Sequence, residues 1–210
     1  DDAELVSLGV GSYMGYIGPG VLVVTAMQMA ATESLWPTMG LLRWGGVYKA
    51  ILATPITSAE LGVAHVMWLG FRAFVAGSSF LLVLALAGAI GSWLGVLIAA
   101  VAVLVAWAHA APLVALTVGL EQENVFPMIS RVIIFPLFLF SGAFFPVEDM
   151  PSAVGAFAKI TPSWHGVELA RHLATGDLVQ ADLFHLGYLV VFCAAGFFLV
   201  QRRFRKHLDI

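Results

Sequence analysis

The chain of 210 residues is 60% hydrophobic and only 11% charged, with a mean hydropathy of +0.95. Soluble domains carry about 25% charged residues, so this composition excludes an ordinary soluble domain and indicates a membrane protein. The net charge of −3 excludes a nucleic-acid binder that works by neutralising phosphates, and the single Cys193, which we interpret as a small apolar filler, excludes an internal disulfide.

Long stretches with few charged residues predict an all-α polytopic membrane protein that forms a single transmembrane domain over 1–210. A helix needs about 20 mostly apolar residues to cross the hydrocarbon core of a bilayer. Proline suits a first helical turn, so the first span is expected to begin at Pro19. Five spans are expected, at about 19–37, 60–88, 93–118, 126–145 and 183–201.

The distribution of Lys and Arg predicts a cytoplasmic C-terminus, because basic residues collect in cytoplasmic loops. The basic run QRRFRKH follows the last span, which places Arg43, Lys49 and Arg131 on the same side. The segment 148–182 is then outside, although it contains Lys159. An outside N-terminus without an export signal leads to the expectation that one upstream span is missing from an original six.

The segment 41–62 predicts a short amphipathic helix, at about 43–54, between the first two spans. Tyr48, Ile51 and Leu52 follow helical spacing and form one apolar face. Pro55 is expected to stop this helix, and Thr57 to Glu60 has the pattern of a capping box that opens the next one. Two interpretations remain open: a helix that lies on lipid headgroups, or a docking element for a cytoplasmic partner.

The backbone after Phe145 is expected to turn back rather than to cross the bilayer. Ser141 and Gly142 end the apolar run, and Pro146 and Pro151 prevent a continuous helix. The segments that follow are too short to span but too apolar for a free loop, which predicts a re-entrant outer hairpin at about 146–175. Irregular backbone at that depth must be covered by protein or water, and Phe144 with Phe145 is expected to supply part of that cover.

Four stretches of the sequence together resemble the ABC-2 permeases of the nodulation and daunorubicin-resistance type. They are PGVLVVTAMQMAATESLWPTM, YKAILATPITSAELGVAHVMW, FPLFLFSGAFFPVEDMP and ITPSWHGVELARHLATGDL. The resemblance implies a type V exporter-like bundle of six spans in the bacterial plasma (inner) membrane, here with five. It also implies a second permease copy or a homologous permease as partner, surrounding membrane lipid, and separate P-loop subunits that hold ATP and Mg.

The resemblance also implies roles for particular residues of this chain. Docking to the ATPase is expected on the cytoplasmic helix, and an outer gate is expected in the re-entrant hairpin, which includes Arg171. The docking residues are Tyr48, Lys49, Ile51, Leu52 and Pro55, and the gate residues are Gly142, Phe144, Phe145, Pro146 and Arg171. The chain contains no Gly-Lys pair and so no P-loop, and no cofactor is expected in it.

Two groups of polar residues lie inside the predicted spans. Glu33 and Arg72 stand near the inner ends of the first two, where the resemblance implies an acid and a base. We interpret them as an intramembrane ion pair, with a role in substrate or proton movement as the alternative. His109 lies in the middle of a span, where it either lines a pathway or makes a hydrogen bond between helices.

The stretch HGVELARH places His165, Glu168 and His172 on one helix face. This spacing allows a metal site, but capping and charge pairing near the outer surface is the preferred interpretation, and no metal is expected. The leading hypothesis is therefore the permease subunit of an ATP-driven exporter that moves an amphipathic drug, lipid or lipid-linked saccharide outward. The alternatives are a membrane-embedded enzyme that uses these histidines or His109, and a channel.

Overall fold

The computed structural model describes residues 13–209, and over this range the chain is helical and contains no strand. Four helical stretches are long and apolar enough to cross a membrane: Tyr13–Trp44, Ser58–Leu86, Trp93–Val118 and Gln180–Leu208. They contain α2 (Tyr13–Glu33), α3 (Trp36–Met39), the π-helical turn η1 (Gly40–Trp44), α5 (Ser58–Leu86), the 3-10 turn η2 (Trp93–Leu97), α6 (Ile98–Val118) and α11 (Gln180–Leu208). The all-α fold class is confirmed.

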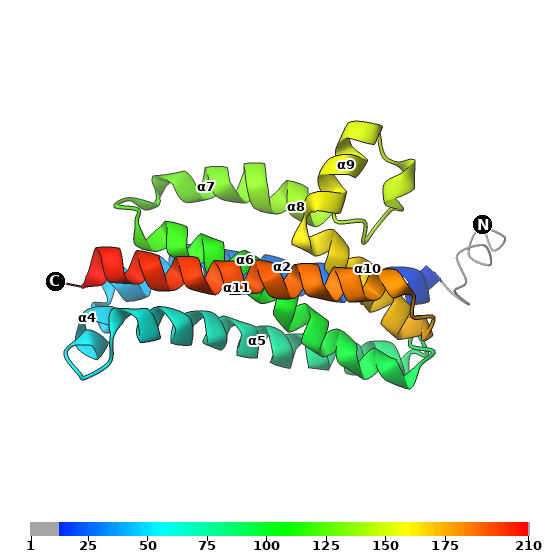
Figure 1. Ribbon diagram of the computed structural model, residues 1–210, viewed down its shortest axis with the longest axis horizontal. Coiled ribbons are helices and arrows are strands. Elements are labelled where there is room, and N and C mark those ends of the chain that lie inside the picture. Colours follow the sequence, from blue (N-terminus) through cyan, green and yellow to red (C-terminus); the bar gives the residue numbers. More distant parts are fainter. Residues whose placement is uncertain (1–12, 210) are drawn as a thin grey trace.

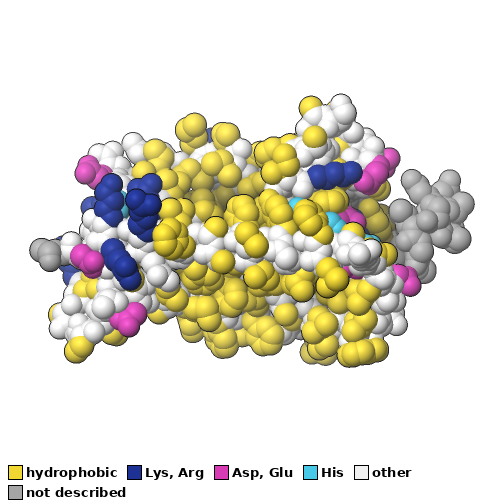
Figure 2. Space-filling view, in the orientation of Figure 1, with side chains coloured by type: hydrophobic (Ala, Val, Ile, Leu, Met, Phe, Trp, Pro, Cys, Tyr) yellow, Lys and Arg dark blue, Asp and Glu magenta, His cyan; other side chains and the backbone are white. Residues whose placement is uncertain are grey.

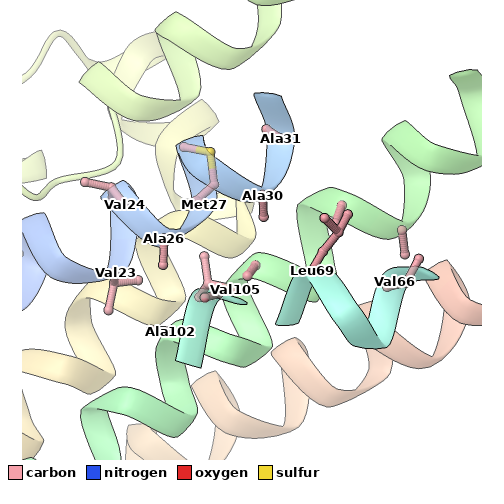
Figure 3. Close-up of a cluster of buried hydrophobic side chains, with 14 of the residues drawn as sticks. Val23, Val24, Ala26, Met27, Ala30, Ala31, Val66, Leu69, Ala102 and Val105 are labelled. Atoms are coloured by element: carbon pink, nitrogen blue, oxygen red, sulfur yellow. The ribbon is translucent and has the colours of Figure 1, made fainter. Parts of the chain in front are cut away.

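Helix α6 is the centre of the bundle, with α2, α5, α10 and α11 packed around it. Small side chains allow these helices to approach closely. Figure 3 shows Ala26 and Ala30 of α2 in the same buried cluster as Ala102 and Val105 of α6 and Leu69 of α5, and all five are nearly inaccessible. The surfaces of α5 and α11 remain largely exposed and apolar, as Figure 2 shows, which is the pattern expected for helices that face lipid.

The first helix differs from the prediction at its start. Pro19 was expected to open the helix, but the described helix already includes Tyr13, and Pro19 lies inside α2. Proline removes one hydrogen bond from the helical ladder. The neighbouring Gly20 lies close to Ala143, since a Cβ added to this glycine would lie 3.2 Å from the Cα of Ala143. Tertiary packing therefore determines this part of the helix.

The segment predicted as the span 126–145 is shorter than expected. It contains α7 (Phe126–Ile129), a π-helical turn η4 (Ser130–Ile134) and α8 (Phe135–Leu139), preceded by a 3-10 turn η3 (Glu123–Val125). The helix ends six residues early because Gly142 has a φ of +82°, which breaks the helical path. Figure 1 shows this helix at the edge of the bundle, where its described contacts are mainly with α2.

The remaining helices lie at opposite ends of the bundle (Figure 1). One end carries α4 (Val47–Leu52) and the C-terminal end of α11. The other end carries the 3-10 turn η5 (Val147–Asp149), α9 (Ser152–Ile160) and the last turn of α10 (Pro162–Thr175). The predicted docking segment and the predicted outer hairpin are therefore at opposite ends of the bundle, which the charge pattern predicts to lie on opposite sides of the membrane.

Candidate functional site

Glu33 and Arg72 form an ion pair between α2 and α5. Arg72 Nη1 donates to Glu33 Oε2 over 2.8 Å, and their side chains are 22% and 43% exposed for Glu33 and Arg72 respectively. Arg72 lies halfway along α5, about 21 Å from Ser58 by the helical rise. The pair is thus farther from the helix end than the sequence indicated.

The surface around Arg72 is apolar. Trp68, Phe71 and Val75, the nearest helical neighbours of Arg72 on α5, are each about half exposed. Ionisable groups are expensive in such a setting unless they are paired. The two charges are therefore expected to depend on each other.

Reversing both charges is expected to restore stability that either single reversal loses. Glu33→Lys or Arg72→Glu alone leaves two like charges together, whereas the double variant reforms an opposite pair. We expect a coupling of about 2 kcal/mol in the free energy of unfolding of the detergent-solubilised protein. Glu33→Gln with Arg72→Gln serves as the uncharged reference, and simple addition of the two single effects would show that the residues are not coupled.

Helix α4, the predicted docking helix, turns part of its predicted apolar face toward the protein. Tyr48 is 2% exposed, and its ring packs near His65 and Phe204 at centroid distances of 5.8 and 6.0 Å. Its hydroxyl has no hydrogen-bond partner among the described residues, and burial raises its pKa well above the usual range for tyrosine. Tyr48 therefore anchors α4 to the bundle and is not exposed for contact with another protein.

The other predicted docking residues divide between the interior and the surface. Ile51 and Leu52 are half-buried, whereas Lys49 and Pro55 are exposed. Helix α4 is also shorter than the predicted 43–54, because Gly46 adopts a φ of +60° and separates it from η1. The exposed surface that remains consists of Val47, Lys49, Ala50, Ala53, Thr54, Pro55 and Ile56.

The capping box that opens α5 is confirmed. Thr57 N donates to Glu60 Oε2 over 2.8 Å, and Glu60 N donates back to Thr57 Oγ1 over 3.3 Å. This reciprocal pair satisfies backbone donors at the start of the helix. It fixes the point at which the chain leaves the predicted docking segment and enters the bundle.

At the other end, Arg171 of α10 joins three segments. Arg171 Nη2 donates to the carbonyls of Gly142 and Ala143 over 2.6 and 3.2 Å, and Nη1 pairs with Glu168 at 3.1 Å. Its guanidinium also lies 3.9 Å from the ring centre of Tyr16 on α2. The side chain is only 12% exposed. The predicted gate residue therefore holds the turn after α8 against α10 and α2.

The predicted gate residues around this turn have different environments. Phe144 packs on Phe138 at a centroid distance of 5.2 Å, whereas Phe145 is 59% exposed. Gly142 lies against Val147, because a Cβ at this glycine would come within 2.9 Å of that side chain. Pro146 lines a pocket of about 350 Å³ together with Arg171 and Glu168. Of this predicted pair, Phe144 therefore covers the turn and Phe145 does not.

The histidines of α10 do not converge on one another. His165 Nδ1 lies 2.7 Å from His185 Nδ1 of α11, and His172 Nδ1 lies 2.6 Å from Asp182 Oδ1. Glu168 is paired with Arg171 instead. Within residues 13–209 no three His, Cys, Asp or Glu side chains are grouped to hold a metal ion. The three residues act as links from α10 to its neighbours.

His109 is buried between α6 and α10. Its Nδ1 lies 2.8 Å from the carbonyl of Val105, which can only accept, so Nδ1 is the donor. In the neutral ring Nε2 then accepts from Ser163 Oγ, at 3.1 Å. Both ring nitrogens are therefore engaged in the hydrogen bonds of helix packing, and the geometry does not favour a catalytic role.

A polar network at the break between α2 and α3 was not predicted from the sequence. Thr38 Oγ1 donates to the carbonyl of Glu33 over 3.0 Å and lies 2.9 Å from His65 Nε2. Thr117 Oγ1 donates to the carbonyl of Ser34 over 2.8 Å. These residues stand singly among apolar neighbours, so no motif marks them. At the break between α2 and α3 the carbonyls of Glu33 and Ser34 accept hydrogen bonds from these threonine hydroxyls. The network lies next to the Glu33–Arg72 pair.

Comparison with known proteins adds a family match over most of the chain. The family model described as "ABC-2 type transporter" matches residues 5–174. Nodulation protein J of Rhizobium leguminosarum bv. viciae is 26% identical over 198 residues, which cover 94% of this chain and 76% of that protein. Nodulation protein J of Rhizobium meliloti (strain 1021) is 28% identical over 199 residues, which cover 94% and 75%.

A third relative is similar over a shorter stretch. The capsule polysaccharide export inner-membrane protein BexB of Haemophilus influenzae is 39% identical over 71 residues, which cover 34% of this chain and 26% of that protein. No solved structure matches the chain. The family model thus covers most of the chain, up to α10.

Proposed function

The chain belongs to the ABC-2 type transporter family, and from this membership we propose that it is the membrane subunit of an ATP-driven exporter. ATP and Mg would bind separate P-loop subunits, because this chain has no Gly-Lys pair. The cargo would be amphipathic: a drug, a lipid or a lipid-linked saccharide. One relative is named as a capsule polysaccharide export protein, which favours a lipid-linked saccharide as the cargo.

The observation that carries the proposal is the different construction of the two ends. At one end α4 is anchored by the buried Tyr48 and presents an exposed surface that includes Val47, Ala50 and Thr54, with Lys49 as its one charged side chain. At the other end Arg171 holds a hairpin over the bundle. An exporter needs a firmly attached contact surface for its ATPase subunit on one side of the membrane and an exit for the substrate on the other.

The proposed placement is in the inner membrane with a cytoplasmic C-terminus. Figure 2 shows Lys and Arg side chains gathered at the end where the C-terminus lies, as basic residues in cytoplasmic loops would be. The proposed second permease copy, identical or homologous, would pack on α7–α8, whose exposed side chains include Met128, Val132 and Phe135. The hairpin of α9 and α10 is proposed to re-enter the outer leaflet.

The docking proposal is tested by Ala50→Glu. Ala50 is exposed on α4, so a longer charged side chain is expected to leave the fold intact while it blocks a protein contact. We expect the amount of co-purified ATPase to fall at least about tenfold, the equivalent of roughly 1.4 kcal/mol, because a charge buried without a partner in an interface is costly. The measurement is a pull-down from membranes in which the ATPase subunit is co-expressed.

Ala181→Glu is the matched control for this experiment. Ala181 is exposed in the first turn of α11, at the end opposite α4, and an acidic residue is favourable there. Both variants should reach the membrane in equal amounts. Equal ATPase recovery with Ala50→Glu and with Ala181→Glu would refute docking at α4.

A further inference from the structure

A hollow of about 300 Å³ lies where η1, α4, the end of α6 and the end of α11 meet. Its lining combines positive and apolar side chains: Leu42, Arg43, Tyr48, Lys49, Val118, His207 and Leu208. No carboxylate of the described residues lines it. Arg43 and Lys49 carry its positive charge, and His207 adds an imidazole; the three come from η1, α4 and α11, so the fold brings them together.

The cations of the hollow have no negative partner within residues 13–209. Arg43 donates through Nη2 to the carbonyl of Leu120 over 2.8 Å, and neither Arg43 nor Lys49 makes an ion pair with a described residue. Arg203 adds a further positive charge, since a Cβ on Gly119 would lie 3.5 Å from its Nη1 and 3.4 Å from His207 Nε2. Positive charge is therefore in excess at the hollow, because the carboxylate of Asp209, which lines an adjoining hollow with Lys49 and His207, accepts a hydrogen bond from Ser58 instead.

The apolar part of the hollow and two tryptophans indicate its depth. Leu42 and Val118 are buried beneath the cations. Trp44, which follows Arg43, is 59% exposed, and Trp36 is 41% exposed, with 6.3 Å between their ring centroids. Exposed tryptophans are enriched at the level of lipid headgroups. The hollow thus combines basic and apolar side chains close to two exposed tryptophans, a combination typical of the level of phospholipid headgroups.

We propose that this hollow binds the headgroup of an anionic phospholipid. The phosphate would lie between Arg43, Lys49 and His207, and the acyl chains would follow the apolar side chains into the bilayer. Because Lys49 belongs to α4 and His207 to α11, the bound lipid would join the docking helix to the end of the bundle. The inference uses the membrane placement of the proposed function but not its ATPase partner.

Lipid titration of the purified full chain tests the site. The protein in a zwitterionic detergent is titrated with dioleoyl phosphatidylglycerol or dioleoyl phosphatidylcholine, and bound lipid is counted by native mass spectrometry. We expect the wild type to prefer phosphatidylglycerol at least about tenfold. Arg43→Gln with Lys49→Gln should weaken phosphatidylglycerol binding roughly thirtyfold, the equivalent of about 1 kcal/mol for each charge.

The control removes two positive charges outside the hollow. Arg202 and Lys206 are exposed on α11 and do not line it, so Arg202→Gln with Lys206→Gln should change phosphatidylglycerol binding less than about twofold. Lys49→Gln alone, at an exposed position whose side chain makes no described hydrogen bond, replaces the test pair if that pair unfolds at a lower temperature without lipid.

Three results would overturn the proposal. Equal losses in the test and control pairs would show a diffuse attraction without a site. Displacement of the lipid by millimolar inorganic phosphate would show that the hollow binds the free anion. Unchanged lipid binding together with lost ATPase recovery in the test pair would assign the hollow to an acidic segment of the ATPase. The lipid titration contains no ATPase, so its outcome is independent of whether α4 docks one.

Discussion

Arg171→Met is expected to lower the free energy of unfolding by about 3 kcal/mol and to impair export strongly, because the variant leaves several partners unsatisfied. The carbonyls of Gly142 and Ala143 and the carboxylate of Glu168 all lose the same donor. The ring of Tyr16 also loses its cation. Methionine preserves much of the side-chain volume, so the effect reports lost polar contacts rather than a cavity.

Glu168→Gln separates the two components of this effect. It removes the ion pair, whose carboxylate side chain is 26% exposed, but retains the hydrogen bonds from Arg171 to the turn. We expect a loss of about 1 kcal/mol or less. Both variants are measured by thermal unfolding in detergent and by efflux of a fluorescent amphiphile at matched expression. Equal losses in the two variants would show that the ion pair, not the attachment of the turn, is what stabilises the hairpin.

Gly70→Ala is expected to destabilise the bundle by about 2 kcal/mol, although alanine is the better helix former. A Cβ at Gly70 would lie 2.0 Å from Nε1 and 2.5 Å from Cε2 of Trp107. The indole cannot shift freely, because its Nε1 donates to the carbonyl of Val66 over 3.1 Å. One added methyl group must therefore separate α5 from α6 or break that hydrogen bond.

Gly77→Ala provides the comparison within the same helix. There the new Cβ would meet Ala102 at 3.4 Å and Leu22 at 3.6 Å, which are ordinary van der Waals distances. We expect this variant to be neutral or up to about 1 kcal/mol more stable, from helix propensity alone. The free energy of unfolding of both variants is measured in mild detergent. A Gly70→Ala protein as stable as Gly77→Ala would show that Trp107 yields without cost.

Local patterns in the sequence predicted much of the helix placement. Long stretches with few charged residues predicted 93–118 for a helix that runs over Trp93–Val118, and 60–88 for α5, which runs over Ser58–Leu86. The capping box of Thr57 and Glu60 was visible because both partners lie within four residues. Such features depend on neighbours along the chain, so they can be recognised without knowledge of the fold.

Tertiary structure decided which face of each helix is buried and which distant groups meet. Helical spacing placed Tyr48 on the apolar face of α4, but spacing alone cannot tell whether such a face packs against the same chain, against lipid or against a partner, and the structure buries Tyr48 in the bundle. The contacts of Arg171 with Tyr16 and Gly142 join segments 155 and 29 residues away. The sequence by itself determined that the chain is a helical membrane protein and where most of its helices lie. Only three-dimensional packing determined the contacts of Arg171, the burial of Tyr48 and the hollow at Arg43 and Lys49, because each is built from residues brought together across the bundle.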